Sequence, residues 1–416
     1  MTIHSVHKLF LSTCLVMSVF VCSVVATVNV IVDPYSLIGW IDNVGFNHEK
    51  PSLRRNQRLS KVFEVSRMQP TIIFLGTSRA AHGLDPLHPA LAGKRTYNLA
   101  IDGANISEIR VLFEHAIALS GANIAIVGLD YGSFDKGELN PGLKLELLDI
   151  GNKTRQNERL LEAVQKSLSL ETLFASYQTI RSQQLPPEFT HQGQRTSKYY
   201  VDFISEFGGV REAFEGYLKE VTNNRRTSSK LAHENIPTPM DEFKAMINQA
   251  RQQGVAMYLF ISPTHAWEQE YLRVRGGWNS FEDWKRELVK IVDDANQETQ
   301  GMAQAQVVLW DFSGYNSVTT ESVPPRGTAN AKMQYFWEWS HYKTVVGGWI
   351  LERILDAEQT QSYIPWDFGV RLTRKNIEAH LADIDHAREI YLRDNPEDVA
   401  FINLIFQQSA DTQGLR

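Results

Sequence analysis

Short, nearly continuous apolar runs alternate with longer amphipathic stretches from residue 71 onward. The runs predict strands at 71–76, 96–101, 123–130, 255–262 and 306–312. The stretches between and after them predict helices at 106–120, 240–253, 280–298 and 344–357. Apolar strands separated by helices are typical of a parallel sheet that is buried on both faces. We therefore expect an α/β fold, a three-layer sandwich around a mainly parallel five-stranded sheet.

Two segments depart from this alternation. Residues 135–238 are polar and predict helices at 158–168, 170–184 and 209–221. They form an insertion between the third and fourth strands, which we expect to be a helical cap beside the functional site. Residues 358–416 predict a helical C-terminal extension. The α/β domain is accordingly expected at 71–357, after a linker and a short amphipathic helix at 34–70.

The amino end carries an uncharged apolar segment, residues 9–32, between Lys8 and Asp33. As a helix it would extend about 36 Å, enough to cross a bilayer with some tilt. The alternative is a cleaved signal peptide, for which Val24-Val-Ala26 is a suitable cleavage site. The apolar run continues to Val32, and this length favours an uncleaved anchor spanning residues 1–33.

The distribution of charged residues and cysteines indicates the side of the membrane on which the domain lies and limits the kinds of partner and site that it can have. Lys8 and the terminal amine precede the apolar segment, whereas acidic residues follow it, which places the large domain outside the cytoplasm. A net charge of −6 without a basic block excludes nucleic acid as the main partner. Cys14 and Cys22 both lie in the apolar segment, so the domain itself has neither a disulfide nor a cysteine metal site.

Polar and small residues follow four of the predicted strands. They are Ser78, Gly103, Asp130 and, in Pro263-Thr-His, His265. Ligands of doubly wound sheets bind beyond the carboxyl ends of the strands, so these positions predict a site at one edge. In isolation, a helix N-cap is the more common role for a serine such as Ser78, and a tight strand-to-helix turn is the more common role for Gly103.

A late acid and histidine, Glu338-x-x-His341, complete a candidate for serine chemistry. A hydroxyl nucleophile needs a base within reach and a group that orients that base. A metal motif would need a second histidine at helical spacing, and the sequence has none there. Nucleotide motifs of the GxGxxG and GxxxxGK[ST] types are also missing, so we expect neither a metal nor a cofactor. His82, His88 and His265 are expected to be structural.

The order of three motifs resembles that of the SGNH hydrolase superfamily. The motifs are Phe74-Leu-Gly-Thr-Ser78-Arg, Tyr97-Asn-Leu-Ala-Ile-Asp-Gly103-Ala and Glu338-x-x-His341-Tyr. Within the superfamily, the sequence is most similar to membrane-tethered branches related to proteins that add or move acyl groups on bacterial cell-surface polymers. The resemblance covers residues 71–131 and 255–357 together with the anchor, and it leaves out the insertion.

The resemblance implies a role for each motif residue. Ser78 would be the nucleophile, His341 the general base, and Glu338 the acid that orients it, where the family more often has aspartate. The backbone N–H groups of Ser78 and Gly103 would bind the oxyanion. The family's oxyanion asparagine is missing from Gly128-Leu-Asp130-Tyr-Gly-Ser133, and Asn105 is the candidate substitute.

Arg79, beside the nucleophile, could steer an anionic substrate or pair internally with Asp102 or Asp130. We favour the internal pair, because a buried arginine usually has a carboxylate partner.

Together, these features predict a serine esterase or O-acyltransferase in a bacterial inner membrane. It would be held by residues 9–32, with its domain in the periplasm or outside, and would act on an acylated glycan or other envelope polymer. The alternative is a catalytically degenerate relative that binds glycan or scaffolds an envelope acylation complex. A membrane acyl-transfer partner is compatible with both hypotheses.

Overall fold

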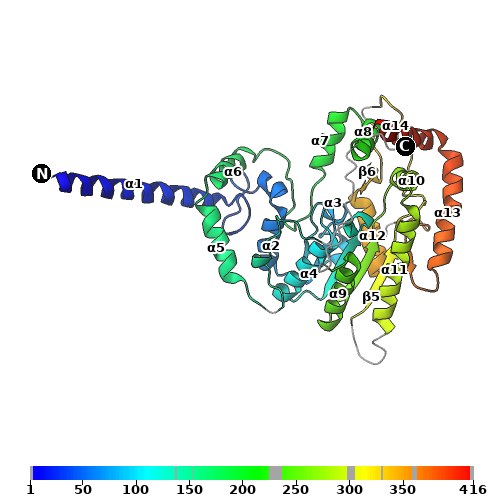
Figure 1. Ribbon diagram of the computed structural model, residues 1–416, viewed down its shortest axis with the longest axis horizontal. Helices are drawn as coiled ribbons and strands as arrows, with labels where there is room; N and C mark the ends of the chain where they lie inside the picture. The colour runs from blue at the N-terminus through cyan, green and yellow to red at the C-terminus, as the bar shows by residue number, and fades with distance from the viewer. Residues whose placement is uncertain are drawn as a thin grey trace.

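A computed structural model describes residues 3–135, 138–151, 153–223, 237–297, 305–328, 331–357 and 363–412 (Figure 1). Its centre is a six-stranded sheet in the order β2-β1-β3-β4-β5-β8. The strands are β1 (Ile72–Leu75), β2 (Thr96–Asn98), β3 (Ile124–Leu129), β4 (Ala256–Ile261), β5 (Val307–Asp311) and β8 (Val370–Leu372). The first five pair in parallel, and β8 pairs with β5 in antiparallel. A separate hairpin contains β6 (Phe336–Glu338) and β7 (His341–Tyr342).

Successive strand residues contribute to two different cores. In β1, Ile73 and Leu75 belong to one apolar cluster and Ile72 and Phe74 to the other. The first cluster takes in α2 (Gln57–Met68), α4 (Ile106–Ser120), α9 (Pro239–Gln252), α11 (Trp278–Gln297) and α13 (Ile377–Asp394). The second takes in α3 (Ser78–Gly83), α8 (Val210–Asn223), α10 (Ala266–Val274), α12 (Thr344–Leu355) and α14 (Pro396–Thr412). The fold is therefore α/β with three layers.

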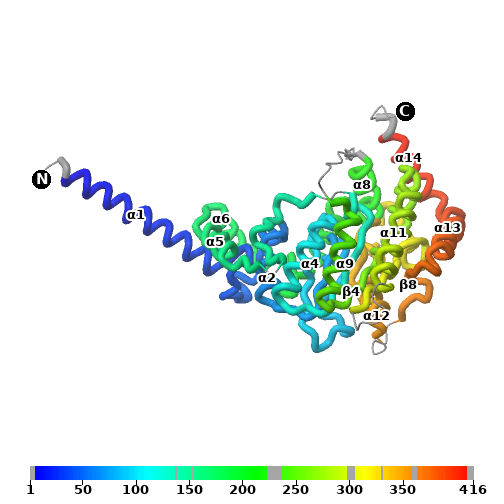
Figure 2. Tube along the Cα trace, turned by 60° about the horizontal axis from the view of Figure 1, so that its bottom comes forward, coloured from blue at the N-terminus to red at the C-terminus, as the bar shows by residue number. Residues whose placement is uncertain are grey.

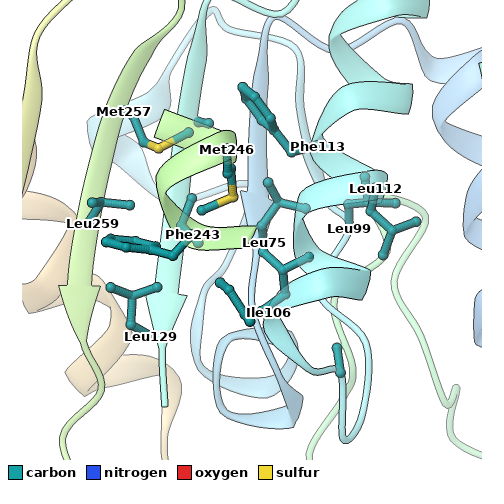
Figure 3. Packing of buried hydrophobic residues seen from close by; sticks show 14 of the residues in the cluster. Leu75, Leu99, Ile106, Leu112, Phe113, Leu129, Phe243, Met246, Met257 and Leu259 are labelled. Carbon is teal, nitrogen blue, oxygen red and sulfur yellow. The ribbon is translucent and has the colours of Figure 1, made fainter. Parts of the chain in front are cut away.

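Large apolar side chains fill the part of the first core between α4, α9 and the sheet. Figure 3 shows Phe113 of α4 and Phe243 and Met246 of α9 above Leu75 and Leu259 of the sheet. All five are fully buried. Figure 2 shows α4, α9 and α11 next to one another over this face. The apolar positions of each helix face the sheet, as the amphipathic pattern predicts.

The five predicted strands are confirmed, but the prediction of a five-stranded sheet is one strand short. The sixth strand, β8, comes from the C-terminal extension, which we expected to be helical. It has three residues, and Arg371 between Val370 and Leu372 is exposed. A strand this short has too few alternating positions to be distinguished from a loop by its pattern.

The first helix, α1 (Ile3–Val32), projects from the rest of the molecule (Figures 1 and 2). It is the one helix in the described part of the chain that is long and apolar enough to cross a membrane. This length and composition suit a single-pass anchor, and a signal sequence meets the same test. The next segment is folded, because the Asp33 carboxylate accepts hydrogen bonds from the N–H groups of Leu37, Ile38 and Gly39.

The insertion has two parts with different neighbours. Its first two helices, α5 (Gln156–Ser167) and α6 (Leu170–Arg181), contact α1. Its last two, α7 (Lys198–Phe207) and α8, contact each other, and α8 reaches β6. Helix α7 was not predicted, and residues 136–137, 152 and 224–236 of the insertion lie outside the described residues. Single-turn 3₁₀ helices occur at η1 (Pro51–Arg55), η2 (Pro89–Leu91), η3 (Tyr131–Phe134) and η4 (Leu145–Leu147).

Two buried histidines form hydrogen bonds with backbone groups that require a neutral imidazole ring. His115 Nδ1 accepts from the Asp149 N–H at 2.8 Å, and its Nε2–H donates to the Val62 carbonyl at 3.2 Å. His265 accepts from the Trp267 N–H and donates to the Glu321 carbonyl in the same way. Burial lowers the pKa of each ring to about 4. If Nδ1 of either ring were protonated, its proton would face a backbone N–H, which cannot accept a hydrogen bond.

These histidines predict that the fold is labile to acid. An unfolded imidazole binds a proton near pH 6.5, whereas the two folded rings bind one only near pH 4. The contribution of these rings to the free energy of unfolding is therefore complete above pH 6.5 and is lost as the pH falls from 6.5 to 4. Each ring contributes about 3 kcal/mol to the loss at the lower end of this range. Thermal unfolding of the full chain in detergent should give a lower Tm at pH 5 than at pH 7. His265→Gln should reduce the difference, whereas exposed His386→Gln should leave it unchanged; equal Tm values at both pH values in the unsubstituted chain would contradict the prediction.

Candidate active site

Ser78 is the first residue of α3, directly beyond the carboxyl end of β1. The chain turns at Gly76, whose φ of +139° and proximity to the Gly128 carbonyl exclude a side chain. Thr77 is the N-cap, and its hydroxyl accepts a hydrogen bond from the Arg79 N–H. The capping role expected for Ser78 in the alternative interpretation thus belongs to Thr77. The Ser78 hydroxyl is left for other chemistry, and its N–H is among those that a helix start does not use.

His341 and Glu338 approach this hydroxyl from the β6–β7 hairpin. Ser78 Oγ lies 2.7 Å from His341 Nε2. On the other side of the ring, His341 Nδ1 contacts Glu338 Oε1 in a short hydrogen bond. The second carboxylate oxygen accepts from the Ser340 N–H at 2.9 Å, and Glu338 is buried. Because the carboxylate holds Nδ1–H, Nε2 faces the serine as a proton acceptor.

Close packing between α3 and α12 brings these two halves together. A Cβ on Gly347 would lie 1.8 Å from the Gly83 carbonyl oxygen, and one on Gly83 would overlap the Tyr342 ring. Tyr342 is fully buried directly after His341. The two glycines therefore let the helix that carries Ser78 lie against the elements that carry His341 and Tyr342.

An open cavity of about 620 Å³ lies over the serine and histidine. Ser78, His341, Gly103 and Asp130 line it, so three of the four predicted strand ends converge there. Gly103 has a φ of +64° in the turn before α4, as a tight turn requires. The fourth strand end differs, because the His265 ring is buried beside the Glu321 carbonyl and its neighbour Thr264 lines an adjoining cavity.

Asn105 lines the cavity but takes part in helix capping. Its Oδ1 accepts from the Glu108 N–H at 2.9 Å, and its Nδ2 donates to the Glu138 carbonyl. The Glu108 carboxylate accepts a hydrogen bond from the Asn105 N–H, which completes a capping box. Oxyanion donation by Asn105 stays a prediction, and it requires Nδ2 to leave Glu138.

Arg79 makes the internal pair that we favoured, with Asp130 rather than Asp102. Its guanidinium lies 3.1 Å from Asp130 Oδ1 and 2.6 Å from Glu268 Oε1, and it also contacts the Ser340 hydroxyl. Although burial opposes the charge, the two carboxylates raise the pKa of Arg79. Burial raises the pKa of Glu268, and Arg79 counteracts this shift. Thr77 donates to the other Asp130 oxygen, so this ion pair also positions the start of α3.

Sequence reasoning expected the insertion beside the site but did not identify which of its residues lie there. The Tyr200 ring of α7 lies 5.1 Å from the His341 ring, and Tyr217 of α8 lines the cavity. Burial, followed by the Glu338 charge, raises the pKa of Tyr200 well above its usual value. Burial lowers the pKa of His82, whose ring centroid is 6.1 Å from that of His341, well below its usual value. Tyrosines in a polar insertion carry no positional signal, so only the fold reveals them.

One group elsewhere in the described residues could hold a metal ion. Asp42, His48 and His191 place their ligand atoms within 4.8 Å of one another. Hydrogen-bond contacts already account for this grouping, because each ring lies near one carboxylate oxygen, at 3.0 Å for His48 and 3.3 Å for His191. No such group found in the described ranges includes Ser78, Glu338 or His341.

The glycine contact gives a first test of this assembly. In Gly347→Ala, the new methyl group meets backbone atoms of α3 that cannot rotate away, which should cost about 1–3 kcal/mol. A lower Tm of the full chain in detergent is the expected result. Gly132→Ala is the matched control, because open space surrounds that position. A Gly347→Ala chain as stable as Gly132→Ala would contradict the close packing.

The role of Arg79 can be separated from substrate steering. Arg79→Met leaves the buried Asp130 and the half-buried Glu268 without their cation and should destabilise the chain by about 3 kcal/mol. Adding Glu268→Gln should restore part of the Tm. Exposed Arg286→Met, which breaks a surface pair with Glu378, should cost about 1 kcal/mol or less. An unchanged Tm with a raised KM in Arg79→Met would instead indicate steering.

Comparison with known proteins adds no assignment. No family model, no curated protein and no solved structure matches the chain. The resemblance to SGNH hydrolases therefore stays a prediction, and the site is defined by its geometry.

Proposed function

We propose that this chain is a serine esterase or O-acyltransferase of the SGNH type, anchored by α1. The observation that carries the proposal is the contact of 2.7 Å between Ser78 Oγ and His341 Nε2, with Glu338 on Nδ1. A hydroxyl, an imidazole and a buried carboxylate in that order are the parts of an activated serine nucleophile. A histidine without a role in the chemistry has no need of a carboxylate on one ring nitrogen and a hydroxyl on the other.

The first half-reaction forms an ester on the enzyme. Ser78 Oγ attacks the carbonyl carbon of the substrate ester while His341 Nε2 takes the hydroxyl proton. Glu338 stabilises the imidazolium that results. When the tetrahedral intermediate collapses, His341 returns this proton to the leaving alcohol oxygen, and the acyl group remains on Ser78.

The second half-reaction removes the acyl group. His341 takes a proton from water or from a sugar hydroxyl, and the oxygen of that acceptor attacks the acyl-Ser78 carbonyl. The protonated ring then returns its proton to Ser78 Oγ as the product leaves. Water as acceptor gives an esterase and a sugar hydroxyl gives a transferase, and both use the same residues.

Backbone donors would stabilise the negative oxygen of both intermediates. The Ser78 N–H at the start of α3 and the Gly103 N–H in the turn after β2 are the candidates, and both residues line the cavity. Asp130 lies where the family has an asparagine, and it cannot donate as a carboxylate. One missing donor of this kind costs about 3–4 kcal/mol of transition-state stabilisation, so we expect slow turnover unless Asn105 supplies it.

The cavity lining supports a hydroxylated substrate. The cavity is lined by the carboxylates of Asp135 and Glu138, the amide of Asn140 and the phenol of Tyr217, among other residues. Such groups suit the hydroxyls of a glycan better than a long apolar chain. With α1 as an anchor and the domain outside the cytoplasm, an acylated envelope polymer meets both conditions.

A fluorophosphonate probe tests the nucleophile directly. The full chain in detergent should be labelled, and Ser78→Ala should abolish labelling. His341→Ala should slow it by about 10³-fold or more, because the base that activates the hydroxyl is lost. Glu338→Gln should slow it as well, since the amide favours the wrong tautomer of the ring.

Ser120→Ala, at the opposite end of α4 from the cavity, is the matched control and should be labelled normally. Labelling that persists in Ser78→Ala would exclude Ser78 as the nucleophile. A folded chain that is never labelled, and that binds glycan equally well in Ser78→Ala and His341→Ala, would support the degenerate binding protein instead.

A further inference from the structure

The helices α5 and α6 present their large apolar side chains to the outside. Eight of these side chains are exposed, from 44% for Ile180 to 72% for Leu170. They are Leu160, Leu161, Val164, Leu168, Leu170, Phe174, Tyr177 and Ile180, and we call them the apolar hairpin face. Soluble domains rarely expose so many neighbouring apolar groups without a partner.

The buried side of α6 has the opposite character. Its buried residues are small or hydroxylated: Thr172, Ala175, Ser176 and Thr179. A helix in water normally buries its large apolar residues and exposes its polar ones. Small residues at helix contacts, with large apolar residues facing outward, are typical of helices in lipid.

These helices hold the end of α1. The Asn29 Nδ2 donates to the carbonyls of Ser167 and Ser169 at 2.8 and 3.0 Å, where α5 passes into α6. Its Oδ1 accepts from the Ser176 hydroxyl at 3.0 Å, and Asn29 is 3% exposed. Figure 1 shows α5 and α6 at the point where α1 leaves the domain, with α5 lying across the direction of α1.

The loop after α1 exposes further large apolar side chains at the same end of the molecule. Asn47 donates to carbonyls at the end of α1 and to that of Ile41, which folds this loop against the helix. Trp40 and Val44 in this loop are 80% and 86% exposed. Tryptophan is enriched where a membrane meets water.

We propose that the α5–α6 hairpin lies in the surface of the lipid bilayer, with the apolar hairpin face against the acyl chains. This inference rests on the proposed anchor, because α1 brings the bilayer to this end of the molecule. Because both helices also contact the apolar helix α1, lipid is the occupant that this face would meet. The hairpin thereby fixes the orientation of the domain on the membrane, which a single helix crossing does not do.

Site-specific labels in the full chain test this contact. A single cysteine replaces Leu161 or Phe174 in a chain that carries Cys14→Ala and Cys22→Ala, and a polarity-sensitive fluorophore is attached. Exposed Val201→Cys on α7 is the matched control. A chain that keeps only the native Cys22 reports on α1. Each is reconstituted into vesicles of phosphatidylcholine and phosphatidylglycerol, with or without bromine on the acyl chains.

Brominated lipid should quench the labels at 161, 174 and 22 severalfold more than the label at 201. Quenching of 161 and 174 by aqueous iodide but not by brominated lipid, with 22 still quenched by lipid, would overturn the hairpin contact and keep the anchor. Labels at 161 and 174 shielded from both quenchers would indicate a protein neighbour and would also overturn it. If brominated lipid does not quench the label at residue 22, α1 does not cross the bilayer, and both the anchor and the proposed lipid contact are contradicted. Fluorophosphonate labelling of the same vesicles reports separately on Ser78.

Discussion

The site depends on the close approach of α3 to α12. Ser78 and His341 are 263 residues apart in the chain, and only the packing of their supporting elements makes them neighbours. Two glycines, Gly83 and Gly347, remove the side chains that would hold the helices apart, and Tyr342 fills the space beside them. A gap of even one methyl group here would separate the hydroxyl from the ring beyond hydrogen-bond distance.

The ion pairs of Arg79 with Asp130 and Glu268 also hold this arrangement in place. Arg79 connects the ends of β1 and β3 and the start of α10 through Asp130 and Glu268, and it also contacts Ser340 beside the histidine. Because Asp130 is buried and Arg79 and Glu268 are partly shielded from water, the loss of one member leaves the others unpaired at high cost. The residue next to Ser78 therefore helps to set the geometry of the site.

Much of the fold followed from the sequence because strand and helix patterns are local. The five apolar runs were found as strands, and the edge where Ser78, Gly103 and Asp130 meet follows from the rule for parallel sheets. Strand β8 was missed because three residues carry too little pattern. Tyr200 and Glu268 were missed because their roles arise only from distant contacts. The sequence also could not show that Thr77, rather than Ser78, takes the capping role.

The junction after α1 is folded rather than loose. Asp33 binds three successive N–H groups, Asn47 closes the following loop, and Asn29 joins α1 to the insertion. A flexible tether would let an anchored domain sweep through a broad volume above its attachment point. A stiff one works as a spacer of constant height, so under the proposed function the opening over Ser78 would reach only the polymer segments that pass through one thin layer of the envelope.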